Sequence, residues 1–267
     1  MTSETIRISV IIGIYNCAST LSEALDSLYA QTYKGFKIIL CDDGSEDDTY
    51  LVAKSYANIY DNILLIKNDK NMGLNYTLNR CLELADTEYC ARMDGDDISL
   101  PTRFEKEIDF LDSHPEYAIV SSPMYYYDSD GVFRKGKGGG EPKVNDFIKG
   151  TPFCHAPCMV RREAYEAVGG YSVDSKLLRV EDYHLWIKMY QKGYRGYNLA
   201  EPLYMMRDDR KAARRRTFKA RQNEAYVKHL ACKMLGLPFY YHIYCLKPLV
   251  LGIMPSWLYR IIYKLRQ

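Results

Sequence analysis

Residues 88–97 read EYCARMDGDD, a short, largely apolar run followed directly by three carboxylates. The run 88–92 has the length of a buried strand, so Asp94, Asp96 and Asp97 are expected where that strand ends. Carboxylates this close repel one another unless a cation lies among them. Mg²⁺ and Mn²⁺ are held by few protein carboxylates together with substrate phosphate oxygens. The stretch therefore indicates a site for a metal-bound diphosphate. An acidic turn is the alternative, because Asp and Gly favour turns.

Strands and helices alternate on the N-terminal side of this stretch. Strands are expected over three nearly continuous apolar runs, at 8–14 (ISVIIGI), 36–41 (FKIILC) and 62–67 (NILLIK). Helices are expected between and after them, at 19–31 with Ser19 as N-cap, at 48–57 and at 71–85. This alternation predicts right-handed crossovers and a mostly parallel sheet with helices on both faces.

Strands and helices alternate less regularly on the C-terminal side of the acidic stretch. Pro101 is expected to open a helix that runs to Ser113. A strand, a turn and a second strand follow over 117–133, then a glycine-rich loop at 135–143 that could act as a lid. The remaining predicted elements are a short strand ending near 160, helices at 161–170 and 180–193, and a last strand at 196–203.

Polar residues follow three of the predicted strands. Tyr15 and Asn16 come after the first strand, Asp42 and Asp43 after the second, and the acidic stretch after the fourth. Ligands bind beyond the carboxyl ends of strands in sheets of this kind. We therefore expect these groups to meet in one crevice.

The composition is that of a globular protein, with 267 residues, 47% hydrophobic, and 25 tyrosines. The eight cysteines form no C-x-x-C pair, and the first residues run straight into a strand without a signal-peptide pattern. Reduced thiols and a cytosolic location are therefore expected. Cys154 and Cys158 flank His155, but no second ligand pair completes a zinc site.

Charge separates the last part of the chain from the rest. Residues 207–267 hold 14 Lys and Arg against three Asp and Glu, whereas the net charge of the whole chain is only +2. Residues 234–259 are apolar and aromatic and are interrupted by three prolines, which disfavours one straight spanning helix. We expect a helical tail that attaches to the cytoplasmic face of the membrane, near a lipid-linked acceptor. A tail packed on the body is the alternative, and nucleic acid is not an expected partner because no recognition motif accompanies the charge.

Together these segments resemble the family 2 glycosyltransferases, the inverting group with the GT-A fold that uses nucleotide-diphosphate sugars. The matching pieces are SVIIGIYN, SLYAQTY, CDDGSEDDT, NMGLNYTLNRCLELADTEYCARMDGDD and VEDYHLW, in the family's order and spacing. The resemblance covers about residues 6–205. It implies a GT-A domain over 1–206, with a nucleotide-binding half at about 1–100 and an acceptor half at about 101–206. Residues 207–267 form the tail outside it.

The resemblance also implies roles on the donor side. Asp43 would accept a hydrogen bond from the nucleotide base, most simply N3–H of a uracil in a UDP-sugar. Tyr15 would lie near the base or ribose. Asn71 and Gly73 precede a helix whose N-terminus could approach the donor, and helix capping is their alternative role. Asp96 would bind Mn²⁺ or Mg²⁺ directly, and Asp94 would contact the ribose or the water around the metal.

On the acceptor side, the resemblance implies that Asp182 is the general base that removes the proton of the acceptor hydroxyl, on a glycan or lipid-linked acceptor. Glu181 would orient the acceptor, or simply favour the start of its helix. His155 is a candidate ligand of phosphate, metal or acceptor, or a structural residue.

Two other classes of protein remain open. A sugar-1-phosphate nucleotidyltransferase would need a basic glycine-rich loop after the first strand, where this chain reads IYNCAST. A non-catalytic subunit of a membrane polysaccharide complex would tolerate loss of the Asp182 carboxylate. A bacterial surface-polysaccharide pathway is the setting that the family suggests.

Overall fold

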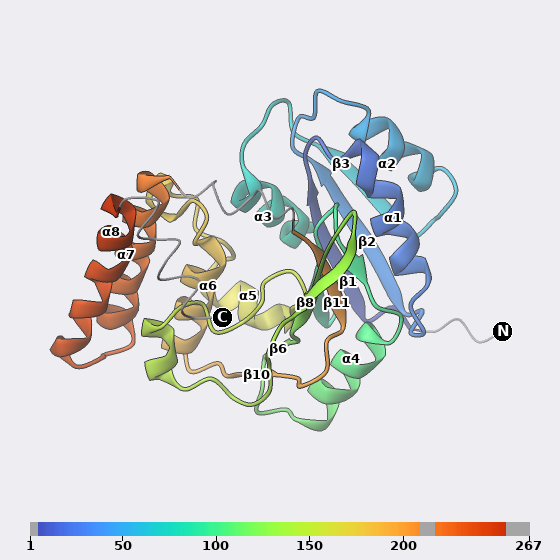
Figure 1. Cartoon of the computed structure of the whole chain (residues 1–267). Helices are drawn as coiled ribbons and strands as arrows, with labels where there is room; N and C mark the ends of the chain where they lie inside the picture. Colours follow the sequence, from blue (N-terminus) through green and yellow to red (C-terminus); the bar gives the residue numbers. More distant parts are fainter. Residues whose placement is uncertain (1–4, 209–216, 255–267) are drawn as a thin grey trace.

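The computed structural model describes residues 5–208 and 217–254, and its architecture is the predicted α/β fold (Figure 1). Within these residues a seven-stranded sheet has the order β10-β6-β9-β4-β1-β2-β3, and a four-stranded sheet has the order β5-β11-β7-β8. The strands of the large sheet are β1 (Ile8–Ile14), β2 (Phe36–Asp42), β3 (Ile63–Lys67), β4 (Tyr89–Arg92), β6 (Ile119–Ser121), β9 (Met159–Arg161) and β10 (Gly196–Asn198). The small sheet contains β5 (Ile98–Ser99), β7 (Met124–Asp128), β8 (Gly131–Lys135) and β11 (Tyr204–Arg207).

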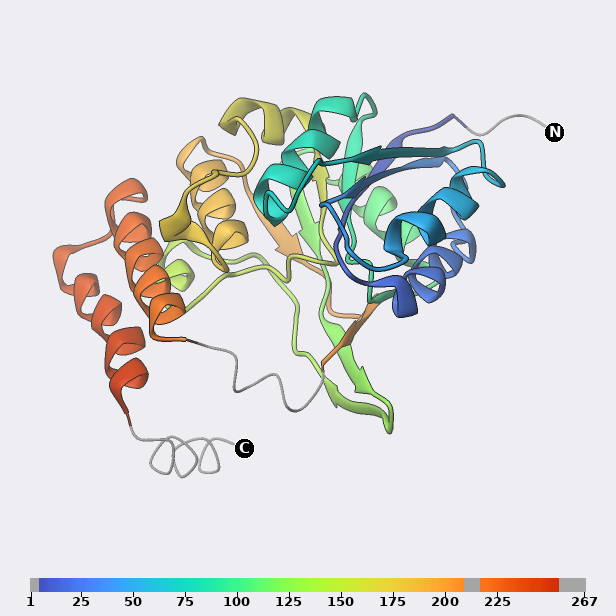
Figure 2. The same cartoon turned by 90° about the horizontal axis from the view of Figure 1, so that it is seen from above.

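Helices cover both faces of the large sheet (Figures 1 and 2). They are α1 (Ala18–Tyr29), α2 (Thr49–Ala57), α3 (Leu74–Leu84), α4 (Arg103–Ser113), α5 (Arg162–Val168), α6 (Glu181–Gln191), α7 (Phe218–Met234) and α8 (Leu246–Ile253), with short 3₁₀ turns η1 (Val144–Ile148), η2 (Ser175–Leu177) and η4 (Phe239–Cys245). Alternate residues of β1 serve the two faces, as strand geometry requires. Val10 and Ile12 pack with α1 and α4, whereas Ile11 packs with α3, α5 and α6.

Parallel pairing aligns the ends of the strands that carry the polar groups. β1 pairs in parallel with both β2 and β4, and β2 pairs in parallel with β3. β9 lies antiparallel between β4 and β6, so the sheet is mostly but not wholly parallel. The carboxyl ends of β1, β2 and β4 therefore lie side by side, as the sequence predicted.

Several expected boundaries were wrong. α1 begins at Ala18 after Cys17, so Ser19 lies inside the helix and does not cap it. α4 begins at Arg103, two residues beyond the expected Pro101. The last predicted strand, 196–203, is a strand only at β10 (Gly196–Asn198), and β11 (Tyr204–Arg207) begins beyond it in the other sheet.

The glycine-rich loop is fixed at two points. The Gly136 N–H donates to the Met124 carbonyl (2.7 Å), and Gly140 exchanges two backbone hydrogen bonds with Asn198. Because both neighbouring segments belong to sheets, the expected lid is anchored along part of its length.

The C-terminal helices pack on the body through α7. Lys228 donates to the Ile148 carbonyl (2.6 Å), and Asn223 donates to the carbonyls of Ser175 and Leu178. η4 and α8 in turn pack on α7. Residues 209–216 and 255–267 of the expected tail lie outside the described residues. The expected division between 206 and 207 falls inside β11, and the separation into two domains stays a prediction.

Two further expectations, on the cysteines and on membrane-spanning helices, can be compared with the structure. All eight cysteines are free. None of the helices in residues 5–208 and 217–254 has the length and apolarity needed to cross a bilayer.

Candidate active site

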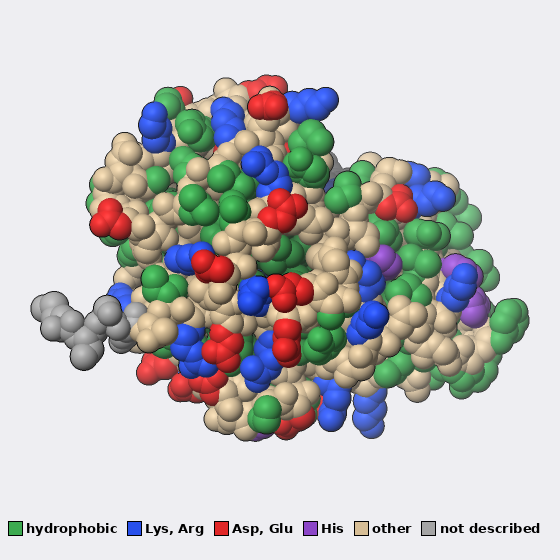
Figure 3. Space-filling model, turned by 180° about the vertical axis from the view of Figure 1, so that it is seen from behind, with side chains coloured by type: hydrophobic (Ala, Val, Ile, Leu, Met, Phe, Trp, Pro, Cys, Tyr) green, Lys and Arg blue, Asp and Glu red, His purple; other side chains and the backbone are tan. Residues whose placement is uncertain are grey.

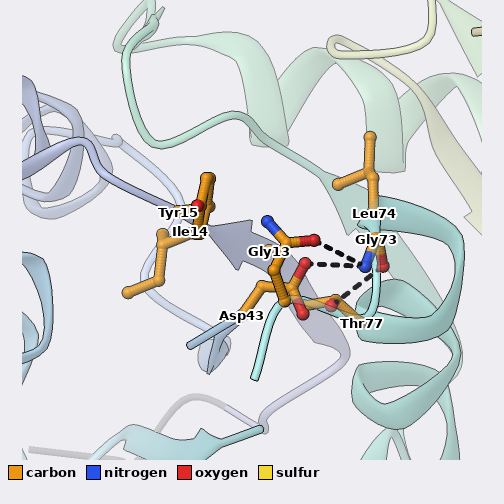
Figure 4. A pocket seen from close by; sticks show the side chains of 8 residues that line it. Gly13, Ile14, Tyr15, Asp43, Gly73, Leu74 and Thr77 are labelled. Atoms are coloured by element: carbon orange, nitrogen blue, oxygen red, sulfur yellow. Dashed lines mark hydrogen bonds between the residues drawn. The ribbon is translucent and has the colours of Figure 1, made fainter. Parts of the chain in front are cut away.

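A cavity of about 180 Å³ opens where β1 and β2 end and α3 begins (Figure 4). Tyr15, Asp43, Asn71 and Gly73, all expected at the nucleotide, line it together. Its complete lining is Gly13, Ile14, Tyr15, Asp43, Asn71, Gly73, Leu74 and Thr77. These residues come from β1, from the residue after β2 and from the segment around the start of α3, so the crossover topology brings them together.

Asp43 anchors the loop that precedes α3. Its Oδ1 accepts hydrogen bonds from Asn68 Nδ2 (2.7 Å) and from the Met72 N–H (2.8 Å). Its Oδ2 accepts one from the Gly73 N–H (2.9 Å). The side chain is almost fully buried, with 4% of its surface exposed. A carboxylate offers about four acceptor positions, so Oδ2 keeps one for a ligand in the cavity.

Two glycines shape this cavity. Gly73 has φ = 89°, a left-handed conformation that other residues rarely adopt, and it directly precedes α3. A Cβ on Gly13 would lie 3.1 Å from the side chains of both Leu74 and Thr77. The close approach of β1 to α3 therefore favours glycine at position 13, because a methyl group there would press on Leu74 and Thr77 and narrow the cavity.

The acidic turn after β4 lies against the wall of this cavity. A Cβ on Gly95 would lie 3.0 Å from Ile14 Cγ2, and the Gly95 carbonyl accepts a hydrogen bond from Thr20 Oγ1 (3.1 Å). The cavity and the candidate metal ligands Asp94 and Asp96 are therefore adjacent, as their positions at strand ends predicted.

The three carboxylates of the turn differ in their surroundings. Asp94 pairs with Arg92 Nη2 (2.6 Å), and the Asp97 Oδ1 accepts the Arg207 N–H (2.8 Å). The Asp96 side chain is exposed at the surface of the turn. Desolvation and then the charge of Asp94 raise the pKa of Asp96. Burial, followed by the charges of Asp94 and Asp96, raises the pKa of Asp97 well above its usual range.

The electrostatics of this turn suit a divalent cation held mainly by a ligand. In the part of the chain that the structure describes, no group of three or more His, Cys, Asp or Glu side chains converges as a metal site. Asp94 and Asp96 can therefore supply one or two carboxylates, and the other ligands would be diphosphate oxygens and water, which is how Mg²⁺ is commonly held. A cation at this point would also relieve the repulsion that raises the pKa values of Asp96 and Asp97.

Glu181 and Asp182 are the first two residues of α6. Burial, and after it the charge of Glu181, raises the pKa of Asp182 to about 7. Burial also raises the pKa of Glu181, whose Oε2 has no hydrogen-bond partner within the described structure. Thr151 Oγ1 lies 3.5 Å from Asp182 Oδ2, at the limit of a hydrogen bond. A carboxylate that titrates near neutral pH in a partly buried position is suited to remove a proton.

Arg92, the last residue of β4, connects the two acidic groups. Its positive charge opposes the rise that burial causes in the pKa values of Asp96, Glu181 and Asp182. The acidic turn and the start of α6 therefore lie within the field of one guanidinium, which brings the predicted donor side and base side to the same region.

His155 is half-buried beside this region. Its Nε2 shares a hydrogen bond with Tyr171 Oη (2.7 Å), and its ring stands edge-on to Tyr171 and Trp186. Burial and then the charge of Arg92 keep the pKa of His155 well below its usual value, so the imidazole is neutral. These contacts favour the structural role that the sequence left open.

Sequence patterns did not predict the contacts that β11 makes with the acidic turn. The Asp94 N–H donates to Tyr204 Oη (3.1 Å), and Arg207 Nε donates to the Asp96 carbonyl (3.2 Å). Arg207 also forms an ion pair with Glu23 (2.7 Å). β11 thus supports the acidic turn from more than 100 residues away in the chain, and only the pairing of β11 with β5 and β7 places it there.

Comparisons with known proteins show which family this sequence belongs to. The family model described as Glycosyl transferase family 2 matches residues 9–169. The putative glycosyltransferase EpsE of Bacillus subtilis (strain 168) is 43% identical over 251 residues, which cover 94% of this chain and 90% of that protein. The UDP-Glc:alpha-D-GlcNAc-diphosphoundecaprenol beta-1,3-glucosyltransferase WfaP of Escherichia coli is 28% identical over 241 residues, 90% of each chain.

A solved structure supports the fold. The mannosyltransferase PcManGT from Pyrobaculum calidifontis, in complex with GDP-Man and Mn²⁺, superposes with a TM-score of 0.69. It shares 20% sequence identity, and the superposition covers 92% of this chain and 73% of that one. With the family match over more than half of the sequence and the close relative over nearly all of it, the chain belongs to glycosyl transferase family 2 and is a glycosyltransferase.

Proposed function

We propose that this enzyme transfers a sugar, with inversion at the anomeric carbon, from a nucleotide-diphosphate sugar to a hydroxyl group of a glycan or lipid-linked acceptor. Two observations support the proposal. The acidic turn with Asp94 and Asp96 contacts the wall of the cavity around Asp43 through Gly95, and the charge of Arg92 acts on both Asp96 and Asp182. A transferase needs these three functions, nucleotide binding, support of the diphosphate and a base, within the length of one donor.

The donor is proposed to be a UDP-sugar. The acceptor position that remains on Asp43 Oδ2 suits the N3–H of a uracil, and Tyr15 at the rim, 42% exposed, offers a ring for the base or ribose. Asn71 and Gly73 complete that cavity beside the first turn of α3. The E. coli relative is named as using UDP-Glc, and the superposed mannosyltransferase as binding GDP-Man, so the nucleotide is the first thing to measure.

Asp96 and Asp94 are the residues that would hold Mn²⁺ or Mg²⁺ with the diphosphate. When bound, the cation would supply a Lewis acid that offsets negative charge on the departing nucleoside diphosphate. Asp96 is the exposed carboxylate, whereas the ion pair with Arg92 fixes the orientation of Asp94. Asp97 accepts a hydrogen bond from the Arg207 N–H and would stabilise the conformation of the turn.

Asp182 is proposed as the general base. It takes the proton of the acceptor hydroxyl while that oxygen forms a bond to the anomeric carbon and the bond from that carbon to the diphosphate oxygen breaks. Attack opposite the leaving group inverts the configuration. Proton removal of this kind accelerates transfer by about 10²–10⁴-fold. The charge of Glu181, next to it, raises the pKa of Asp182, and we propose that Glu181 orients the acceptor.

The acceptor is proposed to be lipid-linked, which agrees with the diphosphoundecaprenol named for the E. coli relative. The surface of the C-terminal helices supports a location at the inner face of the cell membrane. Side chains of η4 and α8 are exposed to solvent although they are apolar or aromatic, and Figure 3 shows hydrophobic side chains gathered over this end of the molecule. We call these residues the C-terminal apolar face: Phe239, Tyr240, Ile243, Tyr244, Leu246, Val250 and Ile253.

Charge complementarity favours an anionic bilayer as the partner of the C-terminal apolar face. No Asp or Glu occurs after Glu224, whereas Lys233 and Lys247 are exposed beside the face. Apolar and aromatic side chains interspersed with basic ones are typical of segments that lie in the headgroup region. Residues 218–253 pack on the body through α7, which is the alternative expectation, and we propose that the C-terminal apolar face nevertheless contacts the membrane.

Cosedimentation with phosphatidylglycerol vesicles tests this location. The double variant Phe239→Ser, Ile253→Ser should lose binding, because these side chains are 85% and 75% exposed and contribute little to the folded core. Leu51→Ser with Ile59→Ser removes similarly exposed apolar groups, 63% and 70%, from the opposite end of the molecule and should bind as the native protein does. Equal binding by both variants would contradict the proposal.

The chemical function is tested by a screen of nucleotide sugars. We expect UDP-sugars, in the presence of Mn²⁺, to raise the thermal unfolding midpoint, since a ligand that binds only the folded state stabilises it. The same donors should then undergo slow hydrolysis that chelation of the metal abolishes. Stabilisation by GDP-sugars alone would overturn the choice of UDP. Binding without hydrolysis or transfer to any lipid-linked acceptor would favour a non-catalytic subunit.

A further inference from the structure

The most unusual side chain of the site is Arg92. Its guanidinium is 1% exposed, and only Nη2 has a charged partner, Asp94 Oδ1 at 2.6 Å. The Nε and Nη1 groups are buried and have no hydrogen-bond partner among the described residues. A buried cation with two unpaired donors is costly, so a position of this kind is kept only where the charge has a use.

The surroundings of Arg92 link the two halves of the site. Its backbone N–H donates to the Cys158 carbonyl (2.8 Å), so it lies beside the turn 155–158 that leads into β9. His155 at the start of this turn packs against Trp186 of α6. One residue of β4 therefore lies between the acidic turn that follows it and the segment that supports the start of α6. At the start of α6, Glu181 Oε2 is a buried acceptor that has no hydrogen-bond partner among the described residues, just as Arg92 has donors without one.

We propose that Arg92 is a positioning residue shared by the donor side and the base side of the site, which holds the Asp94 carboxylate for the donor and supplies the positive charge that balances Glu181 and Asp182. The inference rests on the proposed function, because it assigns a purpose to the buried charge of the same site. Arg92 does not touch the reacting atoms, and it acts through the carboxylates that do.

The ionisation of Asp182 is the most direct consequence. Burial and the charge of Glu181 raise the pKa of Asp182 to about 7, and Arg92 opposes them. Removing the guanidinium should therefore raise this pKa further and leave Asp182 protonated at neutral pH. Several ionisable groups interact electrostatically with Asp182. Glu181 and Tyr183 belong to α6, Cys154 to the segment before β9, Tyr171 to the loop after α5, and Arg92 to β4. Only Arg92 among them is a cation.

The test compares Arg92→Met and Arg92→Lys with the control Arg161→Lys. Arg161 is a partly buried arginine of β9 that donates to the carbonyls of Tyr117 and Leu111, away from the site. The first readout is the titration of the Asp182 carboxyl carbon by NMR in protein labelled at aspartate, with the resonance assigned by its loss in Asp182→Asn. The second is calorimetric binding of UDP with Mn²⁺. Neither readout depends on sugar transfer.

In Arg92→Met we expect the Asp182 titration midpoint to rise by about one pH unit or more, as removal of a nearby cation requires. We also expect UDP–Mn²⁺ binding to weaken by about tenfold, because Asp94 loses its charged hydrogen-bond partner. Arg92→Lys should keep the Asp182 midpoint close to native but still weaken binding, since an ammonium group lacks the planar fork of the guanidinium. Arg161→Lys should change neither.

A folded Arg92→Met protein whose Asp182 midpoint and UDP–Mn²⁺ affinity match the native values would overturn the proposal. If Arg92→Met does not fold, native affinity in Arg92→Lys would overturn it. The outcome is separable from that of the proposed function. Transfer at the native rate by Asp182→Asn would refute Asp182 as base, whatever the NMR titration of Arg92→Met gives.

Discussion

Asp43 is expected to have two roles that a pair of substitutions can separate. Its carboxylate accepts three hydrogen bonds, from Asn68 and from the N–H groups of Met72 and Gly73, and it lines the proposed nucleotide cavity. In Asp43→Asn the remaining oxygen can replace Oδ1 and keep two of these bonds. The new amide group then faces the Gly73 N–H, donor against donor.

The expected losses of stability and of UDP affinity follow from these hydrogen bonds. The Gly73 N–H would lose its charged acceptor and keep only its longer bond to Asn71 Oδ1 (3.1 Å), which lowers the free energy of unfolding by about 1–3 kcal/mol. The same amide cannot accept the N3–H of a uracil. The loss of one hydrogen bond to a charged acceptor, about 1.5–3 kcal/mol, corresponds to UDP binding that is weaker by about 10- to 100-fold.

Urea unfolding gives the stability, and calorimetric titration of the folded variant with UDP and Mn²⁺ gives the affinity. Asp47→Asn is the matched control, because Asp47 also accepts backbone N–H groups, those of Ala18 and Thr49, but does not line the cavity. It should lose stability and keep its affinity for UDP. If Asp43→Asn behaves in the same way as this control, Asp43 only anchors the loop and the assignment to the nucleotide is refuted.

Three further changes have defined expectations. Glu181→Gln removes the like charge beside Asp182, so the acidic limb of the kcat/KM pH profile should move down by about one pH unit, and an unmoved limb would argue against Asp182 as the titrating base. Burial and the charges of Asp94 and Asp96 raise the pKa of Asp97, so this carboxyl group binds its proton more tightly in the folded state than in the unfolded chain. The free energy of unfolding should therefore fall as the pH rises above about 4, which is the pKa of an aspartate in the unfolded chain. Asp97→Asn keeps an oxygen for the Arg207 N–H and should flatten this decline in urea unfolding, whereas an equal slope would contradict the assignment. Gly13→Ala, which places a methyl group 3.1 Å from Leu74 and Thr77, should weaken UDP binding by about tenfold or more while costing about 1–3 kcal/mol of stability, and unchanged affinity would show that the nucleotide lies elsewhere.

The parts of the fold that local sequence could predict are those in which hydrophobic pattern and chain order coincide. β1 spans 8–14 as predicted, because ISVIIGI is apolar except for Ser9 and both faces of that strand are covered by helices. Parallel pairing of β1 with β2 and β4 then follows from the intervening helices. That is why the positions of Asp43, Asp94 and Asp96 relative to one another could be anticipated.

The supports of the site could not be predicted, because they depend on contacts distant in sequence. Tyr204 and Arg207 lie in a four-residue strand with no distinctive alternation, and they contact the acidic turn only through the order of the small sheet. Arg92 ends a largely apolar run, and its burial could not be predicted because arginine is rarely fully buried. The bonds from Met72 and Gly73 to Asp43 likewise depend on how the loop before α3 folds back on β2.

The most direct test of the account is the behaviour of Asp182→Asn once a donor and an acceptor are in hand, with Asp174→Asn as a control on the neighbouring loop. The account predicts that Asp182→Asn binds UDP and Mn²⁺ with native affinity and transfers sugar more slowly by about 10²-fold or more. Transfer at the native rate by Asp182→Asn, under conditions where the control is also fully active, would contradict it.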